Sequence, residues 1–277
     1  MKFLFPSQGT VRGLGSVPGT LMIPLAARAY GARLFPVWDA EDDHAAAQLQ
    51  RCGVDVLNLD EDSATILNVL WRTALIKRHA RAFFERHPDG LGVNLGAGLS
   101  QHFQWLGNGR NRWIDADLPS VLHLRRQCDA PTLDRAQQRV VDLGSPGWWT
   151  KCLAGEASGP TFLILEGVLM YFHPHEVQAI LTELAEHAPP GSELLCDFIS
   201  PWGVGRAGLN PSMANTHAEF RWGARDAREL IDMQPRLELI AQHSVAEAYG
   251  PAGTWMEMLC RPWAGGPMYA MAHLRVT

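Results

Sequence analysis

The sequence predicts an α/β fold in which seven strands form one open, doubly wound sheet. Apolar segments of strand length alternate with segments of helical periodicity between residues 91 and 199. A glycine turn, Gly96-Ala97-Gly98, directly follows the first of these strands. The alternation favours right-handed crossovers and a parallel sheet. A glycine turn at the carboxyl end of the first strand is typical of sheets that bind a nucleoside at that edge.

Length and composition limit the class of protein. A chain of 277 residues with 47% hydrophobic content can bury a substantial core and lies near the upper end of single-domain size. The net charge is −5 and acids and bases are interspersed, so nucleic acid is not an expected partner. No uninterrupted apolar stretch reaches the length of about eighteen residues that a membrane span needs, and we expect no membrane partner.

Two further features favour a cytoplasmic location. The apolar run from Met1 to Pro6 is too short for the core of a secretory signal peptide. The five cysteines are scattered and include no C-x-x-C pair, which favours reduced thiols over a disulfide framework. The sequence therefore predicts a cytoplasmic protein with free cysteines.

We expect residues 1–62 to form an arm followed by cap helices. Residues 7–19 hold five glycines or prolines and suit a mobile arm better than a packed element. An apolar helical pattern covers residues 20–30, and an acidic segment from residue 39 favours the start of a short helix. The strongest helical pattern runs over residues 63–87.

We expect residues 63–277 to form the α/β domain itself. The expected strands lie near 91–95, 111–115, 138–142, 161–166, 192–199, 236–244 and 268–276. The expected helices lie near 99–106, 119–128, 146–154, 174–188 and 225–233. The irregular stretch 200–222 is rich in glycine and proline and is long for a loop in a compact domain, so we interpret it as a substrate-facing lid.

The glycine turn and the carboxylates about twenty residues later indicate which nucleoside to expect. Gly96 and Gly98 let the backbone turn sharply and approach a ligand, and Asp115 or Asp117 can accept hydrogen bonds from a ribose. A third glycine is missing, which disfavours a dinucleotide, and no phosphate-binding Gly-Lys motif occurs. S-adenosylmethionine, which has a ribose and no phosphate, fits better. A tight turn without any ligand is the alternative.

Four stretches resemble the leucine carboxyl methyltransferase superfamily, and in particular its bacterial polyketide O-methyltransferases of the tetracenomycin type. They are Arg72-Thr73, residues 93–99, residues 113–119 and residues 166–171, and the resemblance extends from about residue 20 to residue 245. It implies a class I methyltransferase, with a Rossmann-like sheet and a helical cap, that uses S-adenosylmethionine.

The resemblance also implies a role for each matching residue. Arg72 would pair with the carboxylate of S-adenosylmethionine, and Glu166 would lie beside its amine. The remaining cofactor residues would be the turn Gly96, Ala97 and Gly98, the ribose-side Asp115 and Asp117, and the adenine-side Asp142 and Leu143. Three plainer interpretations stay open: a solvated Arg72, Asp142 as a helix cap, and Glu166 as a buried acid paired with a structural base.

The chain departs from the family pattern after the glycine turn. The family usually continues with Asp-Thr-Arg, whereas this chain has Ser100-Gln101-His102. The loss of both charges changes the floor of the pocket near the methyl donor. It also leaves open the alternative that the chain is a binding protein, which retains the cofactor site but does not catalyse methyl transfer. Arg28 is the nearest candidate for the cation that some family members supply from the N-terminal segment.

The reaction itself needs alignment more than covalent machinery, because a sulfonium methyl leaves in a direct displacement. A carboxylate acceptor is already ionised at neutral pH, whereas a phenol needs a base. The candidates for that base are Tyr171, His173 and His217. His173 is also suited to begin the next helix, and His217 to lie on the surface; no third ligand accompanies His173 and His175, so we expect no metal.

Aromatic residues in the 200–222 stretch suit a planar acceptor. Trp202, Phe220 and Trp222 can stack on one, with core packing as the competing interpretation. The sequence thus predicts an S-adenosylmethionine-dependent O-methyltransferase of secondary metabolism that acts on a carboxylate or phenolic hydroxyl of a small natural product. A protein C-terminal carboxylate is the second choice, and a non-catalytic binder the third. An NAD(P)-dependent oxidoreductase is disfavoured by the missing third glycine.

Overall fold

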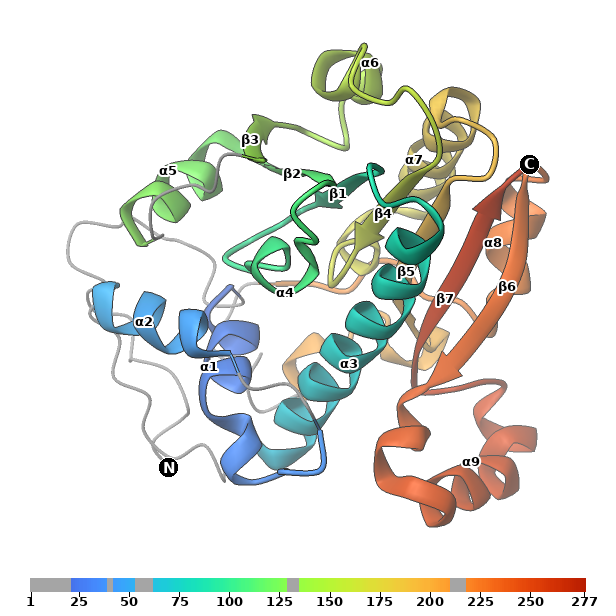
Figure 1. Cartoon of the computed structure of the whole chain (residues 1–277). Coiled ribbons are helices and arrows are strands. Elements are labelled where there is room, and N and C mark those ends of the chain that lie inside the picture. The colour runs from blue at the N-terminus through green and yellow to red at the C-terminus, as the bar shows by residue number, and fades with distance from the viewer. Residues whose placement is uncertain (1–20, 39–41, 53–61, 129–134, 210–217) are drawn as a thin grey trace.

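The computed structural model describes residues 21–38, 42–52, 62–128, 135–209 and 218–277, which form a seven-stranded sheet with helices on both faces (Figure 1). The strand order is β3-β2-β1-β4-β5-β7-β6. The strands are β1 Leu91–Leu95, β2 Arg112–Asp117, β3 Ala136–Val140, β4 Thr161–Leu165, β5 Glu193–Ile199, β6 Leu237–Ser244 and β7 Tyr269–Val276. The α/β fold and its seven strands are confirmed.

The sheet is mixed, which corrects the expectation of a parallel sheet. Strands β1 to β5 pair in parallel, whereas β7 runs antiparallel to both β5 and β6. The alternating pattern ends at residue 199, and β7 enters the space between β5 and β6 from the opposite direction. Its first residue, Tyr269, pairs with Ile199, the last residue of β5. The start of β7 therefore lies at the carboxyl edge of the parallel strands.

Helices cover the two faces of the sheet unequally. Long α3 and short α4 pack on one face through Trp71, Phe83 and Phe103, while α6, α7 and α8 pack on the other. The helices are α1 Met22–Tyr30, α2 Asp43–Arg51, α3 Ser63–Arg86, α4 Phe103–Leu106, α5 Pro119–Cys128, α6 Trp148–Leu153, α7 Pro174–His187, α8 Arg228–Met233 and α9 Gly250–Ala264. Strand β4 is buried throughout, as expected for a parallel strand between two helical layers.

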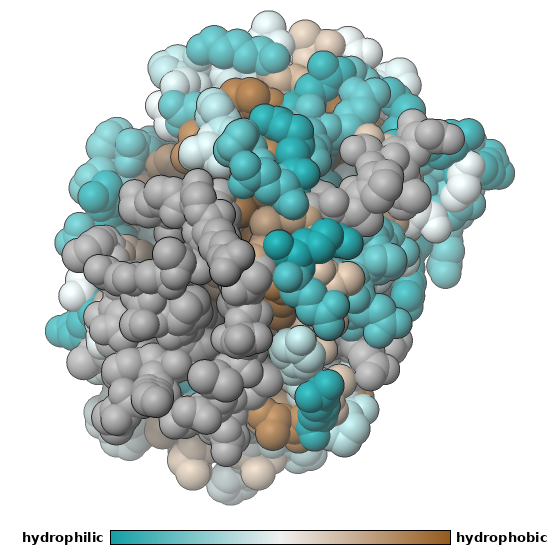
Figure 2. All heavy atoms as spheres, turned by 90° about the vertical axis from the view of Figure 1, so that its left-hand side faces the viewer, coloured by the Kyte–Doolittle hydropathy of each residue, from teal (hydrophilic) through white to brown (hydrophobic). Residues whose placement is uncertain are grey.

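The cap helices are held by side-chain caps and by packing. Asp42 accepts a hydrogen bond from the amide of Ala45 at 3.0 Å, and Asp62 accepts one from the amide of Thr65 at 3.1 Å. Helices α1 and α2 then bury apolar side chains against α5 in a cluster of their own. In Figure 2, which views the molecule from this side, most of the visible described side chains are hydrophilic, with a few hydrophobic ones between them.

A disulfide corrects the expectation that all cysteines are reduced. Cys52 at the end of α2 is bonded to Cys128 at the end of α5, with their Cα atoms 5.5 Å apart. The two cysteines are 76 residues apart in sequence, so spacing alone did not indicate the pairing. Packing of α2 on α5 brings them together. Cys152 and Cys196 are free and buried, and Cys260 is free and exposed.

The 200–222 stretch is described in part. Pro201–Gly203 and Ala207–Leu209 form single 3₁₀ turns, and residues 210–217, which include His217, lie outside the described residues. The expected arm at residues 7–19 also lies outside them. Within the described parts of the chain, no helix is both long and apolar enough to cross a bilayer. The division at residue 62 and the lid stay predictions.

Candidate active site

A cavity of about 720 Å³ opens at the carboxyl edge of the parallel strands. Its walls come from the ends of β1, β2 and β4, from the cap helix α1, from α3 and from the start of β7. This volume lies within the range of small-molecule sites. The cavity brings together these predicted residues: Arg72, Gly96, Ala97, Gly98, Asp117, Asp142, Leu143, Glu166, Tyr171, Trp202 and Phe220.

The glycine turn forms part of the cavity wall because a side chain does not fit there. Gly96 has a φ of +70°, and a Cβ atom at this position would lie 2.5 Å from a methyl carbon of Val168. Gly98 also has a positive φ, of +53°. The amides of Gly96 and Ala97 both donate to the carbonyl of Ala116, at 2.8 and 3.1 Å. Strand β2 thereby holds the turn in an open, left-handed conformation.

Asp117 and Asp115 end strand β2 but have different surroundings. The Asp117 carboxylate accepts hydrogen bonds from the amides of Gly98 and Leu118, both at 2.7 Å, and lines the cavity. Burial raises its pKa, although these two amides act in the opposite direction. A carboxylate has room for about four acceptor bonds, so Asp117 can still accept hydrogen bonds from a ligand.

Asp115 is not among the lining residues, which corrects its expected place beside the ribose. Its carboxylate lies 2.6 Å from the guanidinium of Arg125 and accepts a hydrogen bond from Trp113 Nε1 at 2.9 Å. Residues two apart on a strand point to the same face of the sheet, so Asp115 shares its face with Asp117 but lies further from the carboxyl end of β2. Arg125 also donates to the carbonyl of Gly98 at 3.0 Å. Asp115 therefore supports the glycine turn through Arg125.

Asp142 lies on the cavity wall and also caps a turn. Its two oxygens accept hydrogen bonds from the amide of Gly144 at 3.0 Å and from the hydroxyl of Ser145 at 2.7 Å. The neighbouring Leu143 is buried and lines the same part of the cavity. The cap and the lining position are compatible, because an exposed carboxylate retains free acceptor positions.

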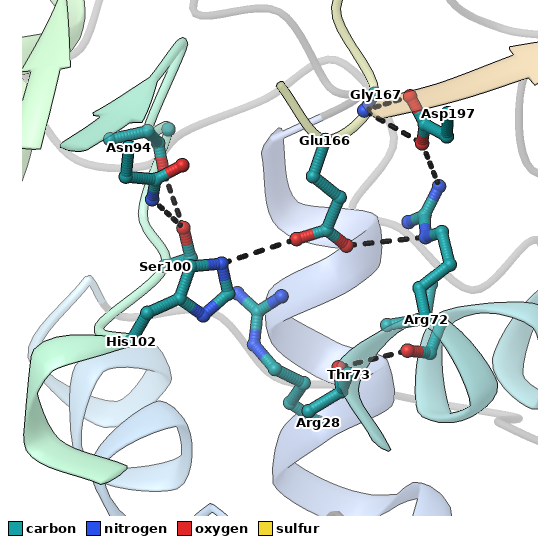
Figure 3. A network of polar contacts seen from close by, with 12 residues as sticks. Arg28, Arg72, Thr73, Asn94, Ser100, His102, Glu166, Gly167 and Asp197 are labelled. Atoms are coloured by element: carbon teal, nitrogen blue, oxygen red, sulfur yellow. Dashed lines mark hydrogen bonds and ion pairs between the residues drawn. The ribbon is translucent and has the colours of Figure 1, made fainter. Parts of the chain in front are cut away.

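Five buried charged or titratable side chains gather where α1 and α3 meet β4 and β5, and we call this group the charged end of the cavity (Figure 3). Its members are Arg28, Arg72, His102, Glu166 and Asp197. Arg72 Nε lies 3.2 Å from Glu166 Oε1, and Arg72 Nη1 lies 3.4 Å from Asp197 Oδ2. His102 Nε2 lies 3.3 Å from Glu166 Oε2. Glu166 is thus held between two nitrogen groups.

The two acids of the charged end differ in their pKa. Burial alone would raise the pKa of Glu166, but the charges of Arg72 and His102 lower it to about 2. Burial raises the pKa of Asp197 to about 6, and the charge of Arg72 does not offset this. Both oxygens of Asp197 also accept from the amide of Gly167 at 2.8 Å. Glu166 is therefore anionic at neutral pH, whereas Asp197 titrates just below neutral pH.

Arg28 supplies the second buried guanidinium of the charged end. It is 2% exposed, its Nε lies 3.7 Å from Asp42, and this Nε has no hydrogen-bond partner among the described residues. Burial lowers its pKa, although the charges of Glu166 and Asp42 act to raise it. The sequence named Arg28 as the nearest N-terminal cation, and the structure places it on the cavity wall beside α3.

Sequence reasoning missed three residues of this network. Tyr269 forms short hydrogen bonds with both Arg72 and Asp197, and it arrives through the antiparallel strand β7. Asp197 carried a usable signal, because an acid in the interior of the buried strand β5 is costly to bury without a partner. His102 was considered only as a departure from the family, although it is fully buried against Glu166.

A second part of the cavity wall has a different character, and we call it the aromatic end: Tyr171, Trp202, Arg206, Phe220 and Met268. The rings of Tyr171 and Phe220 are 5.7 Å apart, and the guanidinium of Arg206 lies 5.1 Å from the centre of the Trp202 ring. Burial raises the pKa of Tyr171 to about 12. A phenol with such a pKa is a poor base at neutral pH.

Two predicted residues lie away from the cavity. Trp222 is 3% exposed and packs in the main core, so the packing interpretation holds for it. His173 is exposed and begins α7, where its amide donates to the Glu176 carboxylate at 2.7 Å. Within the described residues, no group of His, Cys, Asp or Glu side chains could hold a metal ion.

Comparisons with known proteins point to one family. The family model for leucine carboxyl methyltransferase matches residues 26–185. The chain is 26% identical over 270 residues to the tetracenomycin polyketide synthesis O-methyltransferase TcmP of Streptomyces glaucescens, covering 96% of this chain and 95% of that protein. It is also 26% identical over 254 residues to dpfgK of Gibberella zeae, named an S-adenosyl-L-methionine-dependent methyltransferase, covering 85% of each.

Solved structures share the fold. A crystal structure of a methyltransferase candidate from Thermobifida fusca superposes with a TM-score of 0.60 at 16% identity, covering 96% of this chain and 97% of that one. A duf574 family protein from Streptomyces avermitilis gives a TM-score of 0.52, also at 16% identity, with 91% and 97% covered. At such identities the likeness concerns the fold.

Proposed function

Since the chain belongs to the leucine carboxyl methyltransferase family and is an S-adenosylmethionine-dependent methyltransferase, we propose that it methylates a carboxylate oxygen of a small, largely apolar natural product. The observation that carries this proposal is the contrast between the two ends of the cavity. One end is charged and suits a zwitterionic methionyl group. The other is aromatic and, among its described residues, provides a cation but no base.

The charged end fits the methionine part of the cofactor. Arg72 and Arg28 are the guanidinium groups that can hold its carboxylate. The Nε of Arg28 has an ion pair with Asp42 but no hydrogen bond among the described residues, so it can still donate one. Glu166, with its pKa of about 2, is the anion that can hold the ammonium group. Bound here, S-adenosylmethionine supplies an electrophilic methyl group on a sulfonium centre.

The rest of the cavity wall fits the nucleoside. The glycine turn leaves room for the cofactor backbone, and Asp117 retains acceptor positions for the ribose hydroxyls. Asp142 and the buried Leu143 lie further along the wall, where they can contact the adenine. Asp115 takes no part in this proposal except through its support of the turn.

The aromatic end favours a carboxylate over a phenol. Among its described residues, the ionisable groups are Arg206 and a Tyr171 whose pKa is raised to about 12, and neither can accept a proton at neutral pH. A carboxylate acceptor needs no base, because it is already ionised. Its oxygen forms the new bond to the methyl carbon as the carbon–sulfur bond breaks, and no proton moves. Arg206 can orient the acceptor carboxylate.

The walls of the aromatic end also suit a flat ring system. Trp202 and Phe220 present aromatic faces, and Met268 adds a flexible apolar contact. A relative that covers nearly the whole chain is named for polyketide O-methylation. These two observations support an aromatic polyketide-like acid as the acceptor in preference to a protein C-terminus.

The test uses methyl-labelled S-adenosylmethionine with a panel of aromatic carboxylic acids, matched phenols and a C-terminal peptide. We expect label in the acids, in a product that releases volatile methanol on mild alkaline hydrolysis, as an ester does. Alkali-stable label would show a phenol ether, and label only in the peptide would show a protein substrate. Binding of S-adenosylhomocysteine without transfer to any member would support the non-catalytic binder.

A further inference from the structure

Helix α9 exposes more apolar side chains than any other described helix. Trp255, Met256, Met258, Leu259 and Trp263 are 67%, 61%, 65%, 53% and 87% exposed. No described side chain of this helix is buried. In Figure 1 the helix lies below β6 and β7, beyond α3 from the cap helices α1 and α2. Neither the cavity nor the proposed function accounts for this surface.

The side of α9 that faces the protein is polar or small. A Cβ atom on Gly253 would lie 2.5 Å from the carbonyl oxygen of Ala246, so the helix backbone approaches the 3₁₀ segment Val245–Tyr249 closely there. Glu257, one turn later, forms a short hydrogen bond with Ser244. These contacts fix which way the helix faces.

The opposite side is a continuous apolar stripe. Trp255, Leu259 and Trp263 follow one another at intervals of four residues, which aligns them along one face. Met256 and Met258 flank this row. An amphipathic helix normally turns such a stripe toward the core, whereas α9 turns it toward solvent. A stripe in this orientation indicates a surface that is covered in the functional assembly.

We infer that the apolar stripe of α9 is the interface of a homodimer, in which it packs against the same stripe of a second copy. Each aromatic side chain contributes roughly 150–250 Å², so the five exposed side chains and the half-exposed Tyr249 offer on the order of 700 Å². This approaches the roughly 800 Å² per partner of a standard interface. A stripe that pairs with itself satisfies two-fold symmetry without a second complementary surface.

The composition of the stripe fits a protein partner better than a lipid surface. Tryptophan and methionine are enriched in the cores of protein interfaces. Helices that lie on membranes carry lysine and arginine along their polar face, whereas α9 contains one basic residue, Arg261, in a chain of net charge −5. Leu259 lies midway along the stripe. In an antiparallel pair it meets Leu259 of the second copy.

The first test is the mass of the whole chain in solution. Sedimentation over micromolar concentrations is expected to show a species of twice 30.6 kDa. Leu259→Arg should raise the dissociation constant of the dimer by about tenfold or more, as expected at the centre of an interface. The control is Val37→Arg, because Val37 is a single apolar side chain that is 84% exposed elsewhere; it should leave the mass unchanged. Binding of S-adenosylhomocysteine checks that both variants are folded.

The second test identifies the contact. In a Cys260→Ser background, Leu259→Cys should oxidise to a covalent dimer, while Val37→Cys in the same background should not. A chain that stays monomeric at all concentrations would overturn the inference. So would a dimer that tolerates Leu259→Arg together with Trp255→Arg, because another surface would then hold it. Flotation of monomers with phosphatidylcholine vesicles would assign the stripe to lipid and also overturn it.

Discussion

The two ends of the cavity are stabilised in different ways. At the charged end, Arg72, Glu166 and Asp197 are buried and pair with one another, so each group depends on the others for its charge state. At the aromatic end, Trp202 is 53% exposed, the rings of Tyr171 and Phe220 form a tilted pair, and the guanidinium of Arg206 lies over the Trp202 ring. If the charged end holds the cofactor, as proposed, the aromatic end can vary its acceptor without loss of that network.

The largest expected effect is at Arg72, because its removal leaves two buried carboxylates without their cation. Arg72→Ala should weaken binding of S-adenosylhomocysteine by about 1.5–3 kcal/mol, or roughly ten- to 150-fold. Calorimetric titration measures this. The matched control is Arg81→Ala, an exposed arginine on the same helix, which should bind normally.

Arg72→Lys keeps the positive charge but loses the planar guanidinium, which can bind a carboxylate through two parallel hydrogen bonds. This variant should bind S-adenosylhomocysteine with intermediate affinity. This variant separates loss of binding from loss of folding, because it leaves Glu166 and Asp197 with a cation. Unchanged affinity in a folded Arg72→Ala variant would remove Arg72 from the cofactor site and would break the proposed division of the cavity.

The second prediction concerns the pH dependence of stability at Asp197. Its pKa is about 6 in the folded protein, against an ordinary value of 3.8. Between pH 3.8 and about pH 6, Asp197 keeps its proton in the folded protein and loses it in the unfolded chain. The contribution of Asp197 to the free energy of unfolding therefore falls as the pH rises through this interval. Urea unfolding from pH 4 to pH 7 should show this fall relative to Asp197→Asn. Identical slopes for the two proteins would contradict it.

The sequence predicted the strands that position the site better than it predicted the network of charged side chains within the site. All seven strands were expected close to their observed positions. The signal is strongest for β1, β4 and β5, because buried parallel strands appear as short apolar runs. Asp117 and Asp142, which we propose to contact the nucleoside, were predicted because they stand at or just after the carboxyl ends of strands. Tyr269 and His102 were missed, since their contacts depend on the antiparallel insertion of β7 and on the packing of α4.

Helix α9 and the disulfide were missed for related reasons. The α9 segment contains Pro251, Gly253 and Pro262, which argue against a helix, and its apolar pattern is not explained by the core of one chain. Cys52 and Cys128 meet only because α2 packs on α5. The disulfide joins segments that are distant in sequence, and periodicity reports only on neighbours.

A smaller effect is expected at the aromatic end. Trp202→Ala should raise the KM for an aromatic acid by about two- to tenfold, the range of an aromatic contact. Affinity for S-adenosylhomocysteine should stay unchanged, and this is the internal control, since the polar and ring contacts described for Trp202 are with Ser200 and Arg206. A parallel loss of cofactor affinity would show that the two ends are coupled.

The smallest effect is expected at Arg206, because it is exposed and its ion pairing is screened by solvent and salt. Arg206→Gln should raise the KM for a carboxylate acceptor by about fivefold or less, and the difference should shrink further in high salt. The matched control is Arg221→Gln, another exposed arginine near the same loop. A neutral amide analogue that binds as an inhibitor should be unaffected by Arg206→Gln, because it carries no charge for the guanidinium to hold. If the amide and the acid lose affinity equally, Arg206 acts by supporting the Trp202 ring, on which its guanidinium lies, and the acceptor charge is not recognised at this position.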